Sequence, residues 1–470
     1  MALPPRPSRY RPQPAILELG EAFYDRVEAA DFPQAIPRFR NDRWAGAVGL
    51  QKLSDEQWTA HFACFEPLPE NLEMPLALKY HGHQFRIYNP DIGDGRGFLF
   101  AQLADGHDRL LDLGTKGSGQ TPYSRFGDGR LTLKGGVREL LATEMLEALR
   151  VDTSKTFSLI ETGEALERGD EPSPTRSAAM VRLSHGHIRI GTFQRLAYFE
   201  QTEEMERLVA YCHRHFFEGE GAEGPAALLD QASRRTATLA ASYMAAGFVH
   251  GVLNSDNINI TGESFDYGPW RFTPYWDPAF TAAYFDHAGL YSFGRQPEAI
   301  QWDLVQLAVA LRALAEAEEL MPALRAWPER FDRALQAALL ARLGVVPRGE
   351  EKDRTMLRTF ERALAARTAE LDRVFFDWRG GARRGSSPAE QAYEGEAFAA
   401  FGEAIAAYEA APGALDHEYW ADDAPCSMHI DELEAIWARI DEADDWGPLE
   451  DKIAAIRRMG AAHRPLDRVE

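Results

Sequence analysis

Hydrophobic and polar positions divide the chain into a first half of short apolar runs and a second half with helical periodicity. Between residues 76 and 113 the apolar runs alternate with glycine-rich turns, which predicts strands. Residues 180–190 are interpreted as paired short strands, and residues 15–75 as mostly helical with loops. Helices are expected, from the spacing of apolar residues, at 137–149, 203–217, 226–247, 300–325 and 355–374.

This order of elements, strands first and helices afterwards, is the order of the two lobes of a protein kinase. We therefore expect an α+β, protein-kinase-like bilobal fold with a β-rich N-lobe and a mainly helical C-lobe, followed by extra C-terminal helices at 389–411 and 430–459. A Gly- and Arg-rich stretch at 379–388 is the best linker candidate. The expected divisions are an N-terminal extension packing on the lobes (1–75), the N-lobe (76–200), the C-lobe (201–378) and a C-terminal helical extension (379–470).

Composition restricts the class of protein. The formal net charge of −22 argues against nucleic-acid binding as the main role. Three widely spaced cysteines, Cys64, Cys212 and Cys426, imply neither a disulfide framework nor a zinc site. No apolar run reaches transmembrane length, and the Pro-rich residues 1–14 lack the apolar core of a signal peptide. We expect a cytoplasmic protein of bacterial type without a membrane partner, whose N-terminus is an extended arm or a disordered lead.

The segment His250-Gly-Val-Leu-Asn-Ser-Asp-Asn257, followed by Asp266-Tyr-Gly268, is similar to the catalytic loop and metal motif of kinases. The His and the Asn keep their spacing, but Val252 occupies the position of the catalytic Asp. Asn257 and Asp266 remain as candidate metal ligands, nine residues apart, and their oxygen atoms suit Mg²⁺. The pattern predicts a site that holds a nucleotide and Mg²⁺ without ordinary kinase chemistry.

Asp256, directly before Asn257, is a carboxylate at a position where the kinase pattern requires none. In a sequence rich in capping residues it could simply cap a turn. Apolar flanks on both sides instead favour a loop pinned by buried residues, in which this carboxylate could accept a proton from a hydroxyl nucleophile. His250 is interpreted as a structural core histidine, like its kinase counterpart.

Several cations and glycines could bind phosphate. Gly93-Asp-Gly-Arg-Gly97 allows backbone N–H groups to approach phosphate oxygens, although Gly-Asp-Gly is also an ordinary hairpin turn. Lys116 follows an apolar strand, as the phosphate-pairing Lys of kinases does, and Glu139 on the next helix could pair with it. Spacing alone does not choose between Glu139, Glu144 and Glu147 as that partner.

A second Gly-Asp-Gly-Arg, at residues 127–130, contains Asp128 and Gly129, which could cap the following helix or contact nucleotide. Together with Arg96 and Lys116, inward-pointing Arg182 and Arg189 would neutralise much of the charge of a triphosphate. The pairs His81/His83 and His185/His187 have same-face strand spacing, but no third metal ligand is evident for either.

These motifs together resemble the selenoprotein O family (SelO; YdiU in bacteria), a pseudokinase-like family of protein adenylyltransferases. The resemblance covers roughly residues 40–315 and includes His81-Gly-His-Gln-Phe85, Gly93-Asp-Gly-Arg96, Lys116-Gly-Ser-Gly119, Gly127-Asp-Gly-Arg130, Arg138-Glu139, Arg189-Ile-Gly-Thr-Phe193, Gly251-Val-Leu-Asn-Ser-Asp-Asn257, Asp266-Tyr-Gly-Pro269 and Arg295-Gln-Pro297.

The resemblance implies that ATP binds inverted relative to kinases and that AMP is transferred to Ser, Thr or Tyr hydroxyls of proteins, the chain itself included, with release of pyrophosphate. Some bacterial members are described as using UTP. The implied proton acceptor is Asp256, and the implied ligands of Mg²⁺ (or Mn²⁺) are Asn257 and Asp266. The implied nucleotide contacts are Gly93, Gly95, Arg96, Lys116, Asp128, Gly129, Arg182, Arg189 and Asp266.

One family feature is missing from this sequence. Members commonly carry a Cys or selenocysteine near the C-terminus, whereas this chain ends Pro465-Leu-Asp-Arg-Val-Glu470. Two other functions remain open from the residues: a phosphotransferase, against which Val252 argues, and a non-catalytic nucleotide-binding scaffold.

Overall fold

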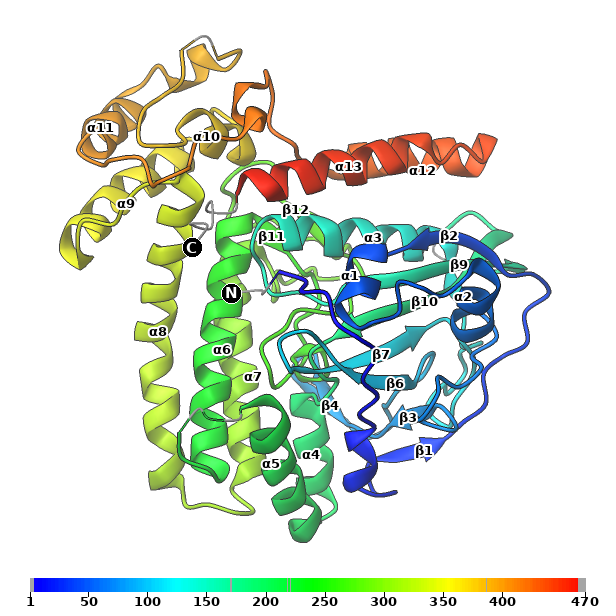
Figure 1. Cartoon of the computed structure of the whole chain (residues 1–470). Coiled ribbons are helices and arrows are strands. Elements are labelled where there is room, and N and C mark those ends of the chain that lie inside the picture. Colours follow the sequence, from blue (N-terminus) through cyan, green and yellow to red (C-terminus); the bar gives the residue numbers. More distant parts are fainter. Residues whose placement is uncertain (1–3, 170, 218, 220, 386, 464–470) are drawn as a thin grey trace.

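The structure is a computed structural model that describes residues 4–463 except 170, 218, 220 and 386 (Figure 1). Its first half is a curled antiparallel sheet and its second half is helical, which confirms the expected kinase-like α+β fold. The strands of the sheet lie in the order β1 (Tyr24–Arg26), β3 (Leu76–Leu78), β6 (Leu99–Ala104), β7 (Leu110–Lys116), β10 (Thr175–Ser184), β9 (Lys155–Leu166) and β2 (Ile36–Arg40), and β8 (Leu131–Thr132) pairs with β10.

Each face of this sheet has its own apolar core, because successive side chains of a strand point to opposite faces. Leu159 and Met180 pack on one face with α3 (Leu133–Ala148). Phe157 and Val181 pack on the other face with α1 (Asp42–Ala47) and α2 (Asp55–Phe62). The sheet is therefore enclosed between helices, and polar residues on its inner faces are buried.

The helical half is built around two long helices, α6 (Pro225–Ala246) and α8 (Ala317–Leu343), which pack on each other (Figure 1). Around them lie α4 (Ile190–Tyr198), α5 (Thr202–Phe216), α7 (Gln296–Leu311), α9 (Glu350–Ala365), α10 (Leu371–Asp377) and α11 (Glu396–Ile405). The chain then returns as α12 (Ile430–Ala443) and α13 (Gly447–Ala462), and both pack on α3. The C-terminal helices thus contact the N-terminal half.

Short elements complete the two halves. Two-stranded sheets are formed by β4 (Gly82–Gln84) with β5 (Ile87–Asn89) and by β11 (Phe248–Val249) with β12 (Arg271–Phe272). The single-turn 3-10 helices are η1 (Ala15–Glu18), η2 (Ser255–Asn257), η3 (Phe293–Arg295), η4 (Glu390–Tyr393) and η5 (Glu418–Ala421). Among the described residues, no helix is both long enough and apolar enough to cross a membrane.

Four element predictions are wrong. Within residues 15–75, expected to be mostly helical, β1 and β2 form the two edges of the sheet; strands this short carry too few residues for a periodic signal. Residues 180–190 are not paired short strands, because they contain the end of one long strand, β10, which pairs with β7 and β9, and the start of α4 at Ile190. The helices expected at 300–325 and 355–374 are each interrupted, the first between α7 and α8 and the second between α9 and α10. The N-terminal residues from 4 onward do form an extended arm, in which Gln13 N–H donates to Gln102 O (3.0 Å).

Candidate active site

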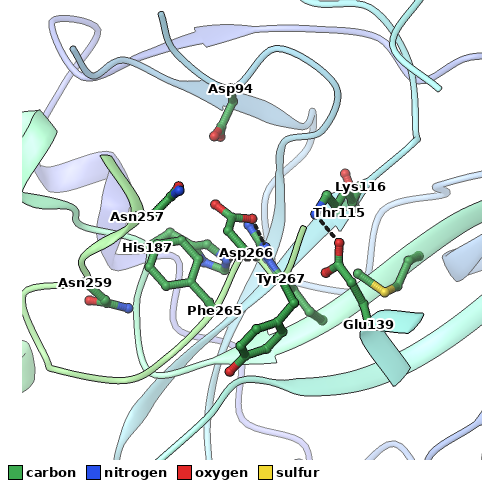
Figure 2. A network of polar contacts seen from close by, with 12 residues as sticks. Asp94, Thr115, Lys116, Glu139, His187, Asn257, Asn259, Phe265, Asp266 and Tyr267 are labelled. Carbon is green, nitrogen blue, oxygen red and sulfur yellow. Dashed lines mark hydrogen bonds and ion pairs between the residues drawn. The ribbon is translucent and has the colours of Figure 1, made fainter. Parts of the chain in front are cut away.

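The predicted site residues meet where the sheet joins the helical half. Lys116 ends β7 and Glu139 lies on α3. Arg182 lies on β10, and Arg189 directly precedes α4. Asp256 and Asn257 belong to η2, and Asp266 follows in the next loop. Figure 2 shows Lys116, Asp266 and Asn257 around one space.

The pairing between Lys116 and α3 is made by Glu139, and both side chains are buried. The other two candidates are engaged elsewhere: Glu144 accepts from Arg457 (2.7 Å) and Glu147 from Arg43 (2.5 Å). Thr132 fixes the start of α3 by accepting from the N–H of Gly135 (3.1 Å). Burial lowers the pKa of Lys116, and the Glu139 carboxylate opposes that shift.

Asp266 is held by two arginines. Its carboxylate forms ion pairs with Arg182 and with Arg189 Nη1 (2.5 Å for Arg189). Burial by itself would raise the pKa of Asp266, but Arg182, Arg189 and Lys116 outweigh it and hold the pKa well below its usual range. Its backbone is left-handed (φ 61°), which turns the side chain toward the cluster. The carboxylate is therefore ionised and surrounded by cations.

Asp256 has a different environment. It is 8% exposed, and its Oδ1 has no hydrogen-bond partner among the described residues. Burial raises the pKa of Asp256 to about 6, against the lowering effect of Arg189. Arg189 Nη1 donates to its backbone carbonyl (2.7 Å). A buried carboxylate with one unpartnered oxygen and a raised pKa has the properties of a general base.

Oxygen donors suitable for a divalent cation lie beside Asp256. Asn257 Nδ2 donates to Val252 O (3.1 Å), so the amide oxygen remains for a ligand. Asp94, Asn257 and Asp266 point toward the same space in Figure 2. Hard oxygen donors of this kind fit Mg²⁺ or Mn²⁺. The four histidines of the two His-Gly-His pairs are less suited, since ring nitrogens of His81, His83 and His187 already contact Tyr88, Gln194 and Asp112.

The first glycine-rich turn is fixed by residues 121–124. A Cβ on Gly93 would lie 2.6 Å from the Tyr123 ring, and one on Gly95 would lie 2.9 Å from Tyr123 O, so both positions require glycine. Ser124 Oγ donates to Gly95 O (2.5 Å). The guanidinium of Arg96 has no ion-pair or hydrogen-bond partner in the part of the chain that the structure describes, and it acts electrostatically on Lys116.

The second glycine-rich turn is less closely connected to the cluster formed by Asp266, Arg182 and Arg189. Asp128 pairs with Arg168 (2.8 Å) and accepts from the N–H of Arg130 (3.0 Å). Gly129 has a left-handed backbone (φ 71°), and Gly119 N–H donates to its carbonyl (3.2 Å). No hydrogen bond or ion pair found among the described residues joins Asp128 to Asp266 or its arginines.

Residues outside the predicted set position the two arginines. Asp94 is partly buried, accepts from the N–H of Leu78 (3.1 Å) and lies 3.5 Å from Arg189. The ring of Tyr80 lies 4.4 Å from the Arg189 guanidinium. His187 Nε2 accepts from Arg182 Nε (3.1 Å). Sequence patterns placed Asp94 in a phosphate-binding turn and His187 in a possible metal pair, but neither pattern indicated a contact with an arginine.

His250 has the structural role expected of it. Its Nε2 contacts Phe265 O (3.0 Å), next to Asp266, and its backbone N–H donates to Gln296 Oε1 (3.0 Å). Burial lowers the pKa of His250, so the ring is neutral. The histidine thereby connects the loop that contains Asp256 to the loop that contains Asp266.

Comparisons with known proteins agree on one family. A family model described as protein adenylyltransferase SelO matches residues 8–457. A protein nucleotidyltransferase YdiU from Synechococcus elongatus is 50% identical over 341 residues, covering 71% of this chain and 68% of the relative. The YdiU of Gloeobacter violaceus is 42% identical over 463 residues, 95% of each chain. That of Vibrio cholerae is 36% identical over 353 residues, covering 74% of this chain and 70% of the relative.

Proposed function

The chain belongs to the SelO family of protein adenylyltransferases, and we propose that it transfers AMP from ATP to Ser, Thr or Tyr hydroxyls of proteins, releasing pyrophosphate. The observation that carries this proposal is the combination of a cationic cluster with a buried Asp256, one oxygen of which has no partner among the described residues, in a loop whose kinase-type Asp is replaced by Val252. The cations suit a triphosphate, and Asp256 supplies the base that Val252 cannot.

The triphosphate is bound by Arg96, Lys116, Arg182 and Arg189, with the γ-phosphate inward and the α-phosphate toward the acceptor. Backbone N–H groups of Gly93 and Gly95 support it, and Asp128 and Gly129 contact the nucleotide from the second turn. Three of the four cations are buried, so their charges are weakly screened and interact strongly with phosphate. Since Arg182 and Arg189 contact Asp266 directly, the phosphates and Asp266 share the same two arginines.

Transfer breaks one bond and forms one bond. The acceptor oxygen attacks the α-phosphorus, the bond from that phosphorus to the oxygen bridging to the β-phosphate breaks, and pyrophosphate leaves with the bonding electrons. Asp256 accepts the hydroxyl proton, and its pKa of about 6 keeps it ionised and ready to do so near neutral pH. Asp266 and Asn257 would hold Mg²⁺ or Mn²⁺, which when bound offsets negative charge on the phosphates.

Mass spectrometry of the intact protein tests this proposal. Wild-type protein is incubated with Mg²⁺, ATP and a bacterial lysate as a source of acceptors, beside Asp256→Asn and the exposed control Asp441→Asn. We expect a mass gain of one AMP unit on the chain or on lysate proteins, lowered about 100-fold or more by Asp256→Asn and unchanged by Asp441→Asn. Asp256→Asn should still bind ATP.

Two results would contradict the proposal. A gain of one phosphate would identify a phosphotransferase in spite of Val252. No label on any protein, together with normal ATP binding, would favour a nucleotide-binding scaffold. The same incubation with UTP in place of ATP tests UMP transfer.

A further inference from the structure

The hairpin formed by β4 and β5 lies directly against the proposed base. A Cβ on Gly82 would lie 2.8 Å from Asp256 Oδ1, so only glycine allows this approach. The hairpin is also hydrogen-bonded to the two residues before Asp256: His83 N–H donates to Ser255 Oγ (2.7 Å), and Phe85 N–H donates to Asn254 Oδ1 (3.0 Å). The hairpin and the catalytic loop therefore form one connected unit.

The turn of this hairpin has an unfavourable backbone conformation. Gln84 pairs with Ile87, which leaves Phe85 and Arg86 as a two-residue turn. Both have left-handed φ values, 51° and 63°, although turns of this kind favour Asn and Gly. Strained backbone is retained where the surrounding structure supports it, and it concentrates at functional sites. Here the strained turn is held by Asn254, two residues before Asp256, and it is followed by the exposed Ile87 on β5.

A second segment extends the apolar surface. The ring centroids of Phe285 and Phe85 are 5.9 Å apart, and those of Tyr284 and Phe285 are 5.1 Å apart. Buried Asp286 fixes this loop by accepting from the N–H groups of Leu290 and Tyr291 (both 2.8 Å). Tyr291 in turn donates to Asn254 Oδ1 (2.7 Å), the same atom that holds the hairpin.

The surface formed by Phe85, Ile87, Tyr284 and Phe285, here called the acceptor ledge, is apolar and open. Ile87 is 73% exposed and Tyr284 is 76% exposed, which is unusual for residues held in fixed positions. Arg86 and Arg295 next to it both contact the single carboxylate of Glu298 (2.8 and 3.4 Å), which leaves one net positive charge at its edge. The ledge itself presents apolar side chains, and an apolar side chain of a partner fits it.

We propose that the acceptor ledge binds the acceptor polypeptide in an extended conformation and selects hydroxyls that have an apolar side chain about two or three residues away. This inference rests on the proposed function. Gly82 touches Asp256, and Phe85 lies three residues further along the chain, in the turn that follows β4, so the two are at most about 10 Å apart. An extended acceptor spans this distance in three residues or fewer, so a hydroxyl at Asp256 places its second or third neighbour at the ledge.

Short synthetic peptides test the inference. Each carries one central hydroxyl residue (Ser, Thr or Tyr in separate sets) and a single Leu at successive positions on either side, in an otherwise Gly- and Ala-based sequence with polar ends. We expect the transfer rate, measured as kcat/KM with Mg²⁺ and ATP, to be about 10-fold higher when Leu lies about two or three residues from the hydroxyl. Equal rates for all Leu positions would overturn the inference.

Variants locate the effect on the ledge. Ile87→Ser and Tyr284→Ser should each remove most of the Leu preference through KM, and leave ATP affinity and the rate with Leu-free peptide unchanged. Val309→Ser, an exposed apolar site on α7, is the matched control and should keep the preference. If the ledge variants instead change the oligomeric state and not KM, the surface binds a second copy of the chain and the inference is wrong.

Failure of the ledge is distinguishable from failure of the proposed function. If wild-type protein labels lysate proteins but no peptide, the lysate labelling by Ile87→Ser and Tyr284→Ser is compared with that by wild type. Equal labelling overturns the inference about the ledge and leaves the proposed function standing. If wild-type protein adenylylates neither peptide nor protein, the proposed function itself fails.

Discussion

The two sides of Asp256 differ in the way their residues are held. On the side proposed to bind the nucleotide, here called the nucleotide side, three cations are buried and paired with carboxylates: Arg182, Arg189 and Lys116. On the acceptor side, the acceptor ledge is exposed and apolar, and only the backbone beneath it is hydrogen-bonded. Removing the partner of a buried charge destabilises the fold, whereas replacing an exposed apolar side chain has little effect on stability. Substitutions on the nucleotide side should therefore affect stability and activity together, and those on the ledge should affect specificity alone.

Among the substitutions on the nucleotide side, Asp266→Ala is expected to have the largest effect on activity and stability together. The substitution removes a proposed metal ligand, leaves Arg182 without its carboxylate and leaves Arg189 with only the longer contact to Asp94 (3.5 Å). We expect AMP transfer to fall about 1,000-fold or more, and the free energy of unfolding to fall by about 3 kcal/mol. Labelling assays and chemical denaturation measure the two quantities.

Asp266→Asn separates metal binding from arginine pairing. Because Asp266 and the phosphates would share two arginines, removing its charge should leave metal-free ATP binding equal to or tighter than that of wild type, although transfer is lost. Titration of ATP in the presence of a chelator measures this affinity. Weaker metal-free binding in Asp266→Asn would contradict a shared arginine pair.

A smaller effect is expected from Lys116→Met, with Arg96→Met as the matched control. Both substitutions remove one proposed phosphate contact, and each should lower kcat/KM for ATP, by about 100-fold for Lys116 and about 10-fold for Arg96. Only Lys116→Met leaves a buried partner, Glu139, unpaired, so only this variant should lose about 3 kcal/mol of stability. Equal stability losses, measured by chemical denaturation, would show that pairing does not distinguish the two cations.

The sequence predicts the site better than it predicts the sheet. Asp256, Asn257 and Asp266 lie in one short stretch, so their proximity follows from local spacing. Lys116 and Glu139 lie on a strand and a helix whose periodicity is visible. Only the tertiary partners distinguish Glu139 from Glu144 and Glu147, because the latter two pair with Arg457 and Arg43. The strands β1 and β2 pair with β3 and β9, which lie far from them in the sequence, and such pairing leaves no mark in a local pattern. The contact between Gly82 and Asp256 is equally non-local.

The C-terminal extension connects to the nucleotide side through α3. Arg457 on α13 donates two hydrogen bonds to the buried carboxylate of Glu144, both 2.7 Å, and Lys134 pairs with Glu434 on α12 (2.7 Å). Glu144 lies on the same helix as Glu139, five residues further along. The extension thus holds the helix that positions the partner of Lys116.

The smallest effect on the nucleotide side is therefore expected from Arg457→Ala. Loss of the bidentate pair leaves the buried Glu144 with only the longer contact to Arg43 (3.9 Å), so we expect a stability loss of about 2 kcal/mol and a KM for ATP raised about 3-fold through displacement of α3. Arg458→Ala is the matched control, because Arg458 is the next residue of the same helix but pairs with Asp422, away from α3. Steady-state kinetics with ATP should separate the two variants. If both variants raise KM for ATP equally, the C-terminal helices act only through general stability. If only Arg457→Ala raises it, the network of ion pairs on the nucleotide side continues through α3 to the C-terminal helices.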